Sequence, residues 1–366
     1  MMTRRRHSCA MSTRDLAQTL PAQRGVHVYQ AGDVLLDRYR LERQLAVGGM
    51  GELWRAVSVA LDQPVAVKLL RRTSRNPDGA SRLLREARVS ARLQHPAIVR
   101  VFDAGTTSEN DPFLVMELLE GEDAGARVRE GGPLDAVEAV KILLPVLSGL
   151  AVAHAQGVVH RDLKPDNIFL ARLSDGTVQP KLIDFGVAHV TMAAVSTKLT
   201  TAGMLLGTPE YMAPEQIESR DDIDARADIW AVGVTLYALI AGVVPFGGES
   251  LHGLFDAILE AHVPYPMRAR GLDGRLWSIL TDCLRRDRAD RFQSAEELER
   301  AFAGWLAQRG ALAEREPSSS PVQKAIGSTL PPTLPSAART KPVEGVSDAP
   351  VVTLDRAIFS ALKKTK

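Results

Sequence analysis

The hydrophobic pattern of this chain changes in character about a third of the way along. Between residues 39 and 117, short segments rich in β-branched and aromatic residues alternate with turn signals, which is typical of strands. One segment, 80–93, has apolar residues at helical spacing instead and ends at His95-Pro96, because a residue before proline is displaced from the α region. The pattern predicts one helix and five antiparallel strands, over 41–47, 52–59, 65–70, 98–103 and 113–117.

Beyond Gly121 the apolar spacing becomes helical. Helices are predicted over 135–156, 228–241, 250–261, 274–284 and 294–308. The sequence therefore predicts an α+β, bilobal fold: a small β-rich N-lobe at about 37–116 and a larger, mainly helical C-lobe at about 121–308. A short crossing segment joins the lobes, and such junctions favour small-molecule sites.

The two ends of the chain lack this regular pattern. Residues 1–36, with five Arg against two Asp, are predicted to be a disordered basic extension. Residues 309–350 are rich in Pro and Ser, which indicates a disordered linker. Residues 351–366 form a short basic tail with Leu354, Ile358, Phe359 and Leu362 on one helical face. A frayed terminus and a docking helix are both compatible with that tail.

Composition narrows the classes of protein. With 45% hydrophobic and 24% charged residues, most of the 366-residue chain should fold. The net charge is +1 and the ends are basic, so the middle is mildly acidic and nucleic-acid binding is not expected. The two cysteines, Cys9 and Cys283, lack disulfide or metal spacing, which fits a reducing, cytoplasmic location. The uncharged run 229–246 follows Asp228 and contains glycine and proline, so we expect a buried core helix and no membrane span.

Candidate chemistry gathers in the stretch from His160 to Asn167. It contains a potential proton acceptor (Asp162), a cation (Lys164) and an oxygen ligand (Asn167), and Asp184 follows a later apolar strand. This combination suits phosphoryl transfer, in which a protein positions a hydroxyl, neutralises phosphate charge and holds a metal ion. Asn167 and Asp184 are candidate Mg²⁺ ligands, because Mg²⁺ uses one or two protein oxygens together with phosphate.

Two weaker signals lie in the predicted N-lobe. The glycines of Gly48–Gly51 would let the backbone approach phosphates, although a plain hairpin needs glycine as well. A strand follows them, which excludes a dinucleotide-binding fingerprint. Lys68 ends the third strand and is a candidate phosphate ligand held by Glu86, although a solvated lysine would look the same.

Taken in order, these motifs resemble those of eukaryotic-type (Hanks-type) protein kinases, and most closely the bacterial serine/threonine branch. The matching segments are Gly48–Gly51, Val65–Lys68, Glu86, His160–Asn167, Asp184–Gly186, Gly207–Glu215, Asp228–Gly233 and Arg291. The resemblance covers about residues 37–308. It implies a bilobal kinase fold that uses ATP and Mg²⁺ to phosphorylate serine or threonine hydroxyls of protein substrates.

The resemblance also implies a role for each matching residue. Asp162 and Lys164 would be catalytic, and Asn167 and Asp184 would hold magnesium. The nucleotide would be bound by Leu45, Ala46, Val47, Gly48, Gly49, Met50, Gly51, Leu53, Ala66, Lys68, Glu86, Met116, Glu117, Leu119 and Phe169. Asp228 would brace the catalytic loop from beneath, and Glu215 would pair with Arg291.

One position departs from the family pattern. Ala46 stands where the glycine loop usually begins with Gly. A Cβ atom there would restrict the backbone, by about 1 kcal/mol if φ must be positive. We therefore expect altered loop mobility or nucleotide affinity, without loss of catalysis.

Substrate type and control follow from the same resemblance. Lys164 and Thr208 fit the serine/threonine pattern. Arg161, directly before Asp162, implies control by a phosphate on the activation loop. Acceptors are expected within 196–201, at Ser196, Thr197, Thr200 or Thr201, with Thr200 best placed. Self-association for autophosphorylation stays open.

Three other functions fit the sequence less well than this one. A pseudokinase or ATP-binding scaffold would lack a catalytic group, and all the groups named above are present. A small-molecule kinase of the aminoglycoside phosphotransferase type would lack the Gly207–Glu215 segment. A DNA- or membrane-binding regulator would need a second folded domain or a membrane span, and the sequence indicates neither in 309–366.

Overall fold

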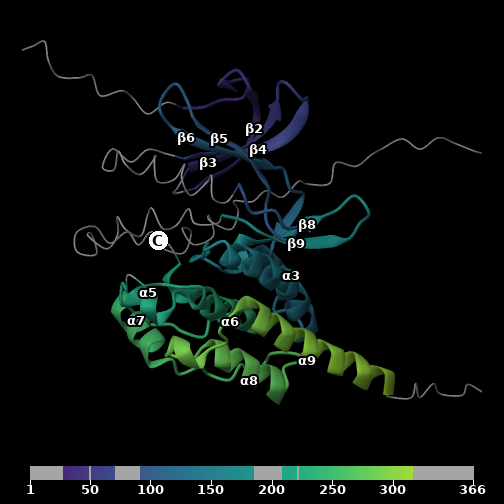
Figure 1. Ribbon diagram of the computed structural model, residues 1–366, viewed down its shortest axis with the longest axis vertical. Coiled ribbons are helices and arrows are strands. Elements are labelled where there is room, and N and C mark those ends of the chain that lie inside the picture. The colour runs from purple at the N-terminus through teal and green to yellow at the C-terminus, as the bar shows by residue number, and fades with distance from the viewer. Residues whose placement is uncertain (1–27, 49–50, 71–90, 185–207, 221, 316–366) are drawn as a thin grey trace, which may run out of the picture.

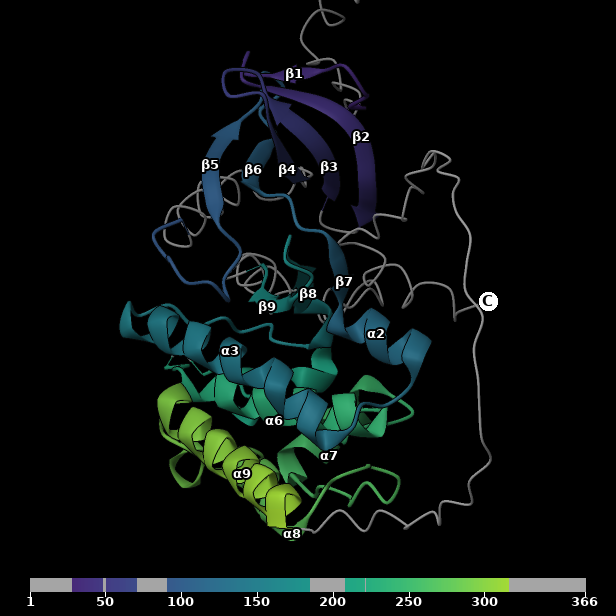
Figure 2. The same ribbon diagram turned by 90° about the vertical axis from the view of Figure 1, so that its right-hand side faces the viewer.

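The computed structural model describes residues 28–48, 51–70, 91–184, 208–220 and 222–315. A twisted β-sheet forms one end of the molecule and a group of helices forms the other (Figures 1 and 2). A small second sheet lies between them, at the top of the helical lobe. The predicted α+β, two-lobed architecture is therefore confirmed.

The N-lobe sheet has six antiparallel strands rather than the predicted five. Their bounds are β1 Val34–Leu35, β2 Tyr39–Gly48, β3 Gly51–Ser58, β4 Gln63–Leu70, β5 Val101–Thr106 and β6 Pro112–Glu117, in the spatial order β1-β2-β3-β4-β6-β5. The extra strand, β1, lies in the segment that the sequence assigned to the N-terminal extension. Two residues are too short to show an alternating pattern, although Leu35 is buried beneath the sheet.

The first hairpin closes between Gly48 and Gly51, which are paired in register. Gly51 has a φ of +153°, and a Cβ atom on it would lie 1.9 Å from the carbonyl oxygen of Leu69 in β4. Glycine is therefore required at position 51 by the close approach of the neighbouring strand. This requirement holds whatever the loop binds.

The predicted strand 98–103 is displaced by three residues, because its first part contacts the other lobe. Ile98 forms an isolated parallel bridge with Leu182, and the Val99 amide donates to the Leu182 carbonyl at 2.9 Å. Ile98 packs in the C-lobe core, so its apolar character reflects contact between the lobes. The predicted helix 80–93 lies mostly outside the described residues.

The C-lobe contains the five predicted helices within a few residues of their expected bounds, apart from a longer final helix. They are α3 Ala136–Ala155, α6 Arg226–Ala241, α7 Leu251–Glu260, α8 Gly274–Cys283 and α9 Ala295–Arg315. A small sheet of β7 Gly121–Asp123, β8 Ile168–Arg172 and β9 Val178–Leu182 lies in this lobe, and the sequence indicated only the end of β9, as the apolar strand before Asp184. It missed β7, β8 and the short helices α2 Ala124–Gly131 and α5 Pro214–Ile217. These elements are too short to show a period, and α2 depends on Asp123, whose side chain accepts the Ala126 amide.

The centre of the C-lobe is α6, whose residues 227–240 are all buried. A Cβ atom on Gly233 would lie 2.7 Å from that of Cys283, so glycine lets α6 and α8 approach closely. The helix ends at Gly242, which adopts the left-handed conformation that favours glycine. The uncharged run 229–246 is thus a core helix and its exit, as predicted.

Helix α3 is long and apolar enough to cross a membrane by length and composition alone. More than half of its apolar window is buried inside the structure, where it packs against α6, α9 and β9. A central helix of a globular lobe passes the same test, so this finding is weak evidence for a membrane span.

Candidate active site

A buried carboxylate fixes the loop that carries the candidate chemistry. Asp228, in the first turn of α6, is fully buried beneath this loop, as predicted. Its Oδ2 accepts the His160 amide and its Oδ1 accepts the Arg161 amide, both at 2.8 Å. His154 Nε2 lies 2.7 Å from the same Oδ2. Burial alone would raise the pKa of Asp228, but these hydrogen bonds and the two histidines lower it, so the carboxylate stays ionised.

The loop is held in a strained conformation at Arg161, whose φ is +65°. A non-glycine residue in this region is destabilised by about 1–3 kcal/mol and persists only where its surroundings impose it. Asp228 accepts the Arg161 amide, and Gln216 Nε2 donates to the Arg161 carbonyl at 3.1 Å. Sequence reasoning missed His154 and Gln216, since neither belongs to a motif, although Gln216 directly follows Glu215.

The two predicted catalytic residues lie together. Lys164 Nζ lies 3.1 Å from Asp162 Oδ2 and 3.3 Å from Oδ1, and it also donates to Thr208 Oγ1 at 3.0 Å. Both side chains are mostly buried yet reach solvent, with 21% of Asp162 and 14% of Lys164 exposed. A carboxylate and an ammonium at the surface of one loop can orient a hydroxyl and neutralise a phosphate beside it.

The predicted metal ligands are brought together by the backbone. The Ile183 amide donates to the Asn167 carbonyl at 3.0 Å, so the next residue, Asp184, lies close to Asn167. Asn167 Nδ2 donates to the Asp162 carbonyl at 2.6 Å and to Asp162 Oδ2 at 3.0 Å, which leaves Oδ1 as its ligand atom. One carboxylate and one amide oxygen suit Mg²⁺ that is also bound by phosphate. In the described part of the chain no cluster of three or more His, Cys, Asp or Glu residues forms a self-sufficient metal site.

Lys68 of the N-lobe and Asp184 of the C-lobe make direct contact. Lys68 Nζ donates to Asp184 Oδ1 at 2.7 Å, with 10% and 24% of the two side chains exposed. Burial would raise the pKa of Asp184, but the Lys68 ammonium, with His160 and Lys164, lowers it. Asp184 has a φ of +62°, a second strained residue in this site. Glu86, the predicted partner of Lys68, lies outside the described residues.

An apolar cluster beside this ion pair gathers most of the predicted adenine-binding side chains. It joins residues of both lobes: Leu53, Ala66, Val99, Leu114, Met116, Leu119, Phe169, Ala171 and Ile183, with Leu45 and Ala46 packed against it. A cluster that joins two lobes beside a lysine and a carboxylate is the expected environment of a flat heterocycle with phosphates attached. Below, this group is called the adenine cluster.

The other residues predicted to bind the nucleotide lie outside this cluster or outside the described residues. Val47 and Gly48 end β2, and Gly49 and Met50 lie outside the described residues. The Glu117 carboxylate accepts Lys181 Nζ and the Arg100 amide, each at 2.8 Å. Its side chain is thus occupied, so only its backbone is available to a nucleotide, as the resemblance implies.

The strain argument for Ala46 is wrong. Ala46 is not among the described non-glycine residues with positive φ. It pairs with Leu53 across the β2–β3 hairpin, and its methyl group packs against the adenine cluster. Its Cβ atom therefore adds contact area without backbone strain.

The predicted ion pair between Glu215 and Arg291 lies in the C-lobe core. Arg291 Nη1 and Nη2 donate to the two Glu215 oxygens at 2.8 Å each, and the guanidinium lies over the Trp230 ring at 5.1 Å. The predicted phosphate acceptors Ser196, Thr197, Thr200 and Thr201 lie outside the described residues. The regulatory role of Arg161 therefore stays a prediction.

Comparison with known proteins identifies the family. Residues 39–303 match the protein kinase domain. The chain is 34% identical over 323 residues to the serine/threonine-protein kinase pkn3 of Myxococcus xanthus, covering 87% of this chain and 58% of that protein. It is 39% identical over 264 residues to the serine/threonine-protein kinase PknL of Mycobacterium tuberculosis, covering 71% of this chain and 64% of that protein. The chain thus spans about three-fifths of the length of these relatives.

Solved structures agree with this result. The kinase domain of Mycobacterium tuberculosis PknI aligns with a TM-score of 0.61 at 27% identity, covering 76% of this chain and 99% of that one. Rad53 residues 1–466, solved in complex with AMP-PNP, aligns with a TM-score of 0.58 at 25% identity, covering 71% and 63%. The chain belongs to the protein kinase family.

Proposed function

We propose that this protein is a serine/threonine protein kinase that transfers the γ-phosphoryl group of ATP to hydroxyl groups of proteins. The observation that carries the proposal is the contact between Lys68 and Asp184, which joins the lobes next to Asp162, Lys164 and Asn167. This contact supports a site in which a phosphate-binding cation, two metal ligands and a proton acceptor surround one space. The names of the relatives, all serine/threonine-protein kinases, support the same activity.

In this proposal the nucleotide lies between the lobes. The adenine ring occupies the adenine cluster, and Lys68 binds the phosphates. Asn167 and Asp184 hold Mg²⁺, which neutralises phosphate charge when bound. The AMP-PNP in the Rad53 structure supports ATP as the nucleotide.

The chain's own residues then position the substrate hydroxyl. Asp162 orients the hydroxyl and accepts its proton as the hydroxyl oxygen bonds to the γ-phosphorus. The bond from that phosphorus to the β–γ bridging oxygen breaks, and ADP leaves. Lys164, already bonded to Asp162 and Thr208, offsets the negative charge of the transferring group.

Specificity and control follow from the same residues. Lys164 and Thr208 support serine and threonine as acceptors, and Lys164 Nζ donates to Thr208 Oγ1 at 3.0 Å. Arg161 binds a phosphate that the kinase adds within 196–201, which orders the active site. We place this activity in the cytoplasm and expect no nucleic-acid partner. Autophosphorylation between two copies would require transient self-association.

The proposal is tested by incubating the protein with labelled ATP, Mg²⁺ and a generic basic protein. We expect label on serine or threonine, and its loss in Asp162→Asn. The control is Asp256→Asn, the same change at an exposed site on α7, which should keep full activity. ATP binding without transfer by the wild-type protein would favour the pseudokinase alternative.

The control mechanism has its own test. Mass mapping of ATP-treated protein should find phosphate within 196–201, absent from the Asp162→Asn variant. An active protein without phosphate in this segment would exclude the proposed control while leaving the kinase activity in place.

A further inference from the structure

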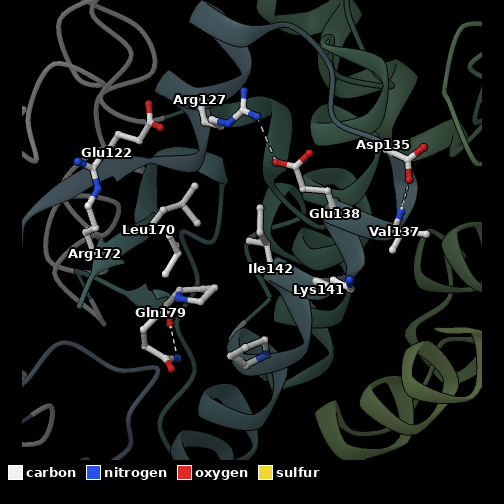
Figure 3. A pocket seen from close by; sticks show the side chains of 13 residues that line it. Glu122, Arg127, Asp135, Val137, Glu138, Lys141, Ile142, Leu170, Arg172 and Gln179 are labelled. Atoms are coloured by element: carbon white, nitrogen blue, oxygen red, sulfur yellow. Dashed lines mark hydrogen bonds and ion pairs between the residues drawn. The ribbon is translucent and has the colours of Figure 1, made fainter. Parts of the chain in front are cut away.

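A surface groove of about 600 Å³ lies on the C-lobe, away from the candidate active site. Its walls are the first three turns of α3 on one side and β8 and β9 on the other (Figure 3). Its floor is apolar, formed by Ile142, Pro145, Leu170, Val178 and Pro180. Val178, at the start of β9, is 56% exposed and lies among these other apolar side chains.

The groove lies behind the nucleotide site and does not overlap it. Successive residues of a strand point to opposite faces, and in β8 Phe169 belongs to the adenine cluster whereas Leu170 lines the groove. An occupant of the groove would contact the back of β8 and leave Asp162 and Lys68 accessible. Nothing in the proposed kinase reaction uses this surface.

The rim of the groove carries charges of both signs. Arg127 and Glu138 pair across it at 3.3 Å, and Asp135 caps α3 by accepting the Val137 amide (Figure 3). Within the described residues, the side chains of Lys141 and Arg172 form no ion pair. A segment with an apolar face and flanking charges of both signs would match such a rim.

The sequence contains one such segment that the proposed function leaves unused. Residues 351–366 carry Leu354, Ile358, Phe359 and Leu362 at helical spacing, with Asp355 and Arg356 among them and lysines after them. They lie outside the described residues. Their apolar spacing is that of the amphipathic segments that dock in apolar grooves.

The last helix that the structure describes approaches one end of the groove. Close to the end of α9, Arg309 Nη2 donates to the Gly271 carbonyl. A Cβ atom on Gly271 would lie 2.9 Å from Asp135 Oδ2, and Asp135 stands at the head of the α3 wall. Arg309, in the last two turns of the final helix, is therefore linked through Gly271 to one end of the groove.

The linker is long enough for the remaining distance. As a flexible coil, residues 316–350 would span roughly 30 Å, which is about the length of the 20-residue helix α3. A segment tethered at such a distance has an effective concentration in about the millimolar range, so even weak docking would be well populated.

We propose that residues 351–366 dock in this groove of their own chain, with Leu354, Ile358 and Leu362 against the apolar floor. The docked segment would brace α3 against β8 and β9 behind the nucleotide site. This inference does not depend on kinase activity, so it can fail while the proposed function holds.

The test is cysteine cross-linking in the full-length chain. Cys9→Ser leaves Cys283, which is buried, as the remaining native cysteine. Val178→Cys on the groove is combined with Ala361→Cys on the tail, and a short bismaleimide is added. The matched control combines Ala361→Cys with Val243→Cys, since Val243 is similarly exposed at 63% and follows Gly242, which contacts Pro133 near the start of α3.

We expect the 178–361 pair to form an intramolecular cross-link at least about tenfold faster than the 243–361 pair. Adding Ile358→Asp should abolish this advantage, and Ser360→Asp, on the opposite helical face, should preserve it. Equal rates for the two pairs would overturn the proposal. Cross-linked dimers that disappear on dilution would also overturn it, because they would show that the tail docks on a second copy.

Discussion

Two ion pairs in this protein differ in how many of their hydrogen-bonding groups are paired within the structure. In the C-lobe, Arg291 is fully buried and donates five hydrogen bonds, two to Glu215 and three to backbone carbonyls. Between the lobes, Lys68 contacts an Asp184 that is 24% exposed and has a strained backbone. Arg291 has no N–H left for a ligand, whereas the interlobe pair borders the space proposed for ATP. The pair whose hydrogen-bonding groups are all paired thus supports the structure. The pair that is partly exposed and has a strained backbone borders the proposed site of chemistry.

The largest effect on stability should come from breaking the satisfied pair. Glu215→Ala leaves the Arg291 guanidinium buried without its counter-charge, so the free energy of unfolding should fall by about 3–5 kcal/mol. The control is Glu218→Ala, which removes a partner that Arg220 contacts at 2.7 Å on the surface. That change should lower the free energy of unfolding by no more than about 1 kcal/mol. Urea unfolding of both variants measures the difference, and equal losses would refute the distinction drawn here.

Changing the pair between the lobes, Lys68 and Asp184, should affect activity strongly and stability little. Asp184→Asn keeps the shape of the side chain but removes the charge that faces Lys68 and would hold the proposed Mg²⁺, so phosphoryl transfer should fall by about 10²–10³-fold. The free energy of unfolding should change far less than in Glu215→Ala, because Asp184 reaches solvent. Steady-state transfer rates and urea unfolding of the same preparation test this. A stability loss as large as that of Glu215→Ala would make Asp184 a structural residue.

Asp123 is an intermediate case that sharpens the comparison. Only 2% of Asp123 is exposed, and among the described residues its ion pair is with Arg129, at 3.3 Å. Burial raises its pKa to about 6, although the Ala126 amide and Arg129 act in the opposite direction. The folded state therefore binds a proton more tightly than the unfolded state, for which the pKa is about 3.9. Stability from this group is fully present below about pH 4 and is lost as the pH rises through about 6.

Asp123→Asn should remove the loss of stability that accompanies ionisation of the buried carboxyl. The variant should still cap α2, since asparagine is a good N-cap. Relative to wild type, the variant should become more stable between pH 4 and 7 by up to roughly 3 kcal/mol. Urea unfolding across this range measures it. Asp135→Asn, the same change at the partly exposed cap of α3, should give a nearly pH-independent difference. A pH-independent difference for Asp123→Asn as well would show that Arg129 fully satisfies the buried carboxylate.

The parts of this molecule that could be read from sequence are those encoded locally. Asp162, Lys164 and Asn167 lie within six residues, and long helices such as α6 carry their own apolar pattern. The elements that were missed depend on distant partners. His154 matters because α6 brings Asp228 against it, and the contact between Lys68 and Asp184 joins residues 116 positions apart. No periodicity encodes such pairs. The family resemblance indicated that Lys68 and Asp184 would share one site, and it gave no sign of His154.

The smallest expected effect concerns Ala46, a single methyl group beside the proposed nucleotide site. Its methyl group packs on the adenine cluster, and its φ is not positive, so Ala46→Gly removes a contact and relieves no strain. Losing the methyl and freeing the backbone should weaken nucleotide binding by up to about 1 kcal/mol. The KM for ATP should rise by up to about fivefold with kcat unchanged, because the contact is the same in the ground and transition states. Ala104→Gly, which removes a methyl from the same cluster but from β5, controls for packing alone. A lower KM in Ala46→Gly would mean that the usual glycine serves loop motion, and that Ala46 restricts it.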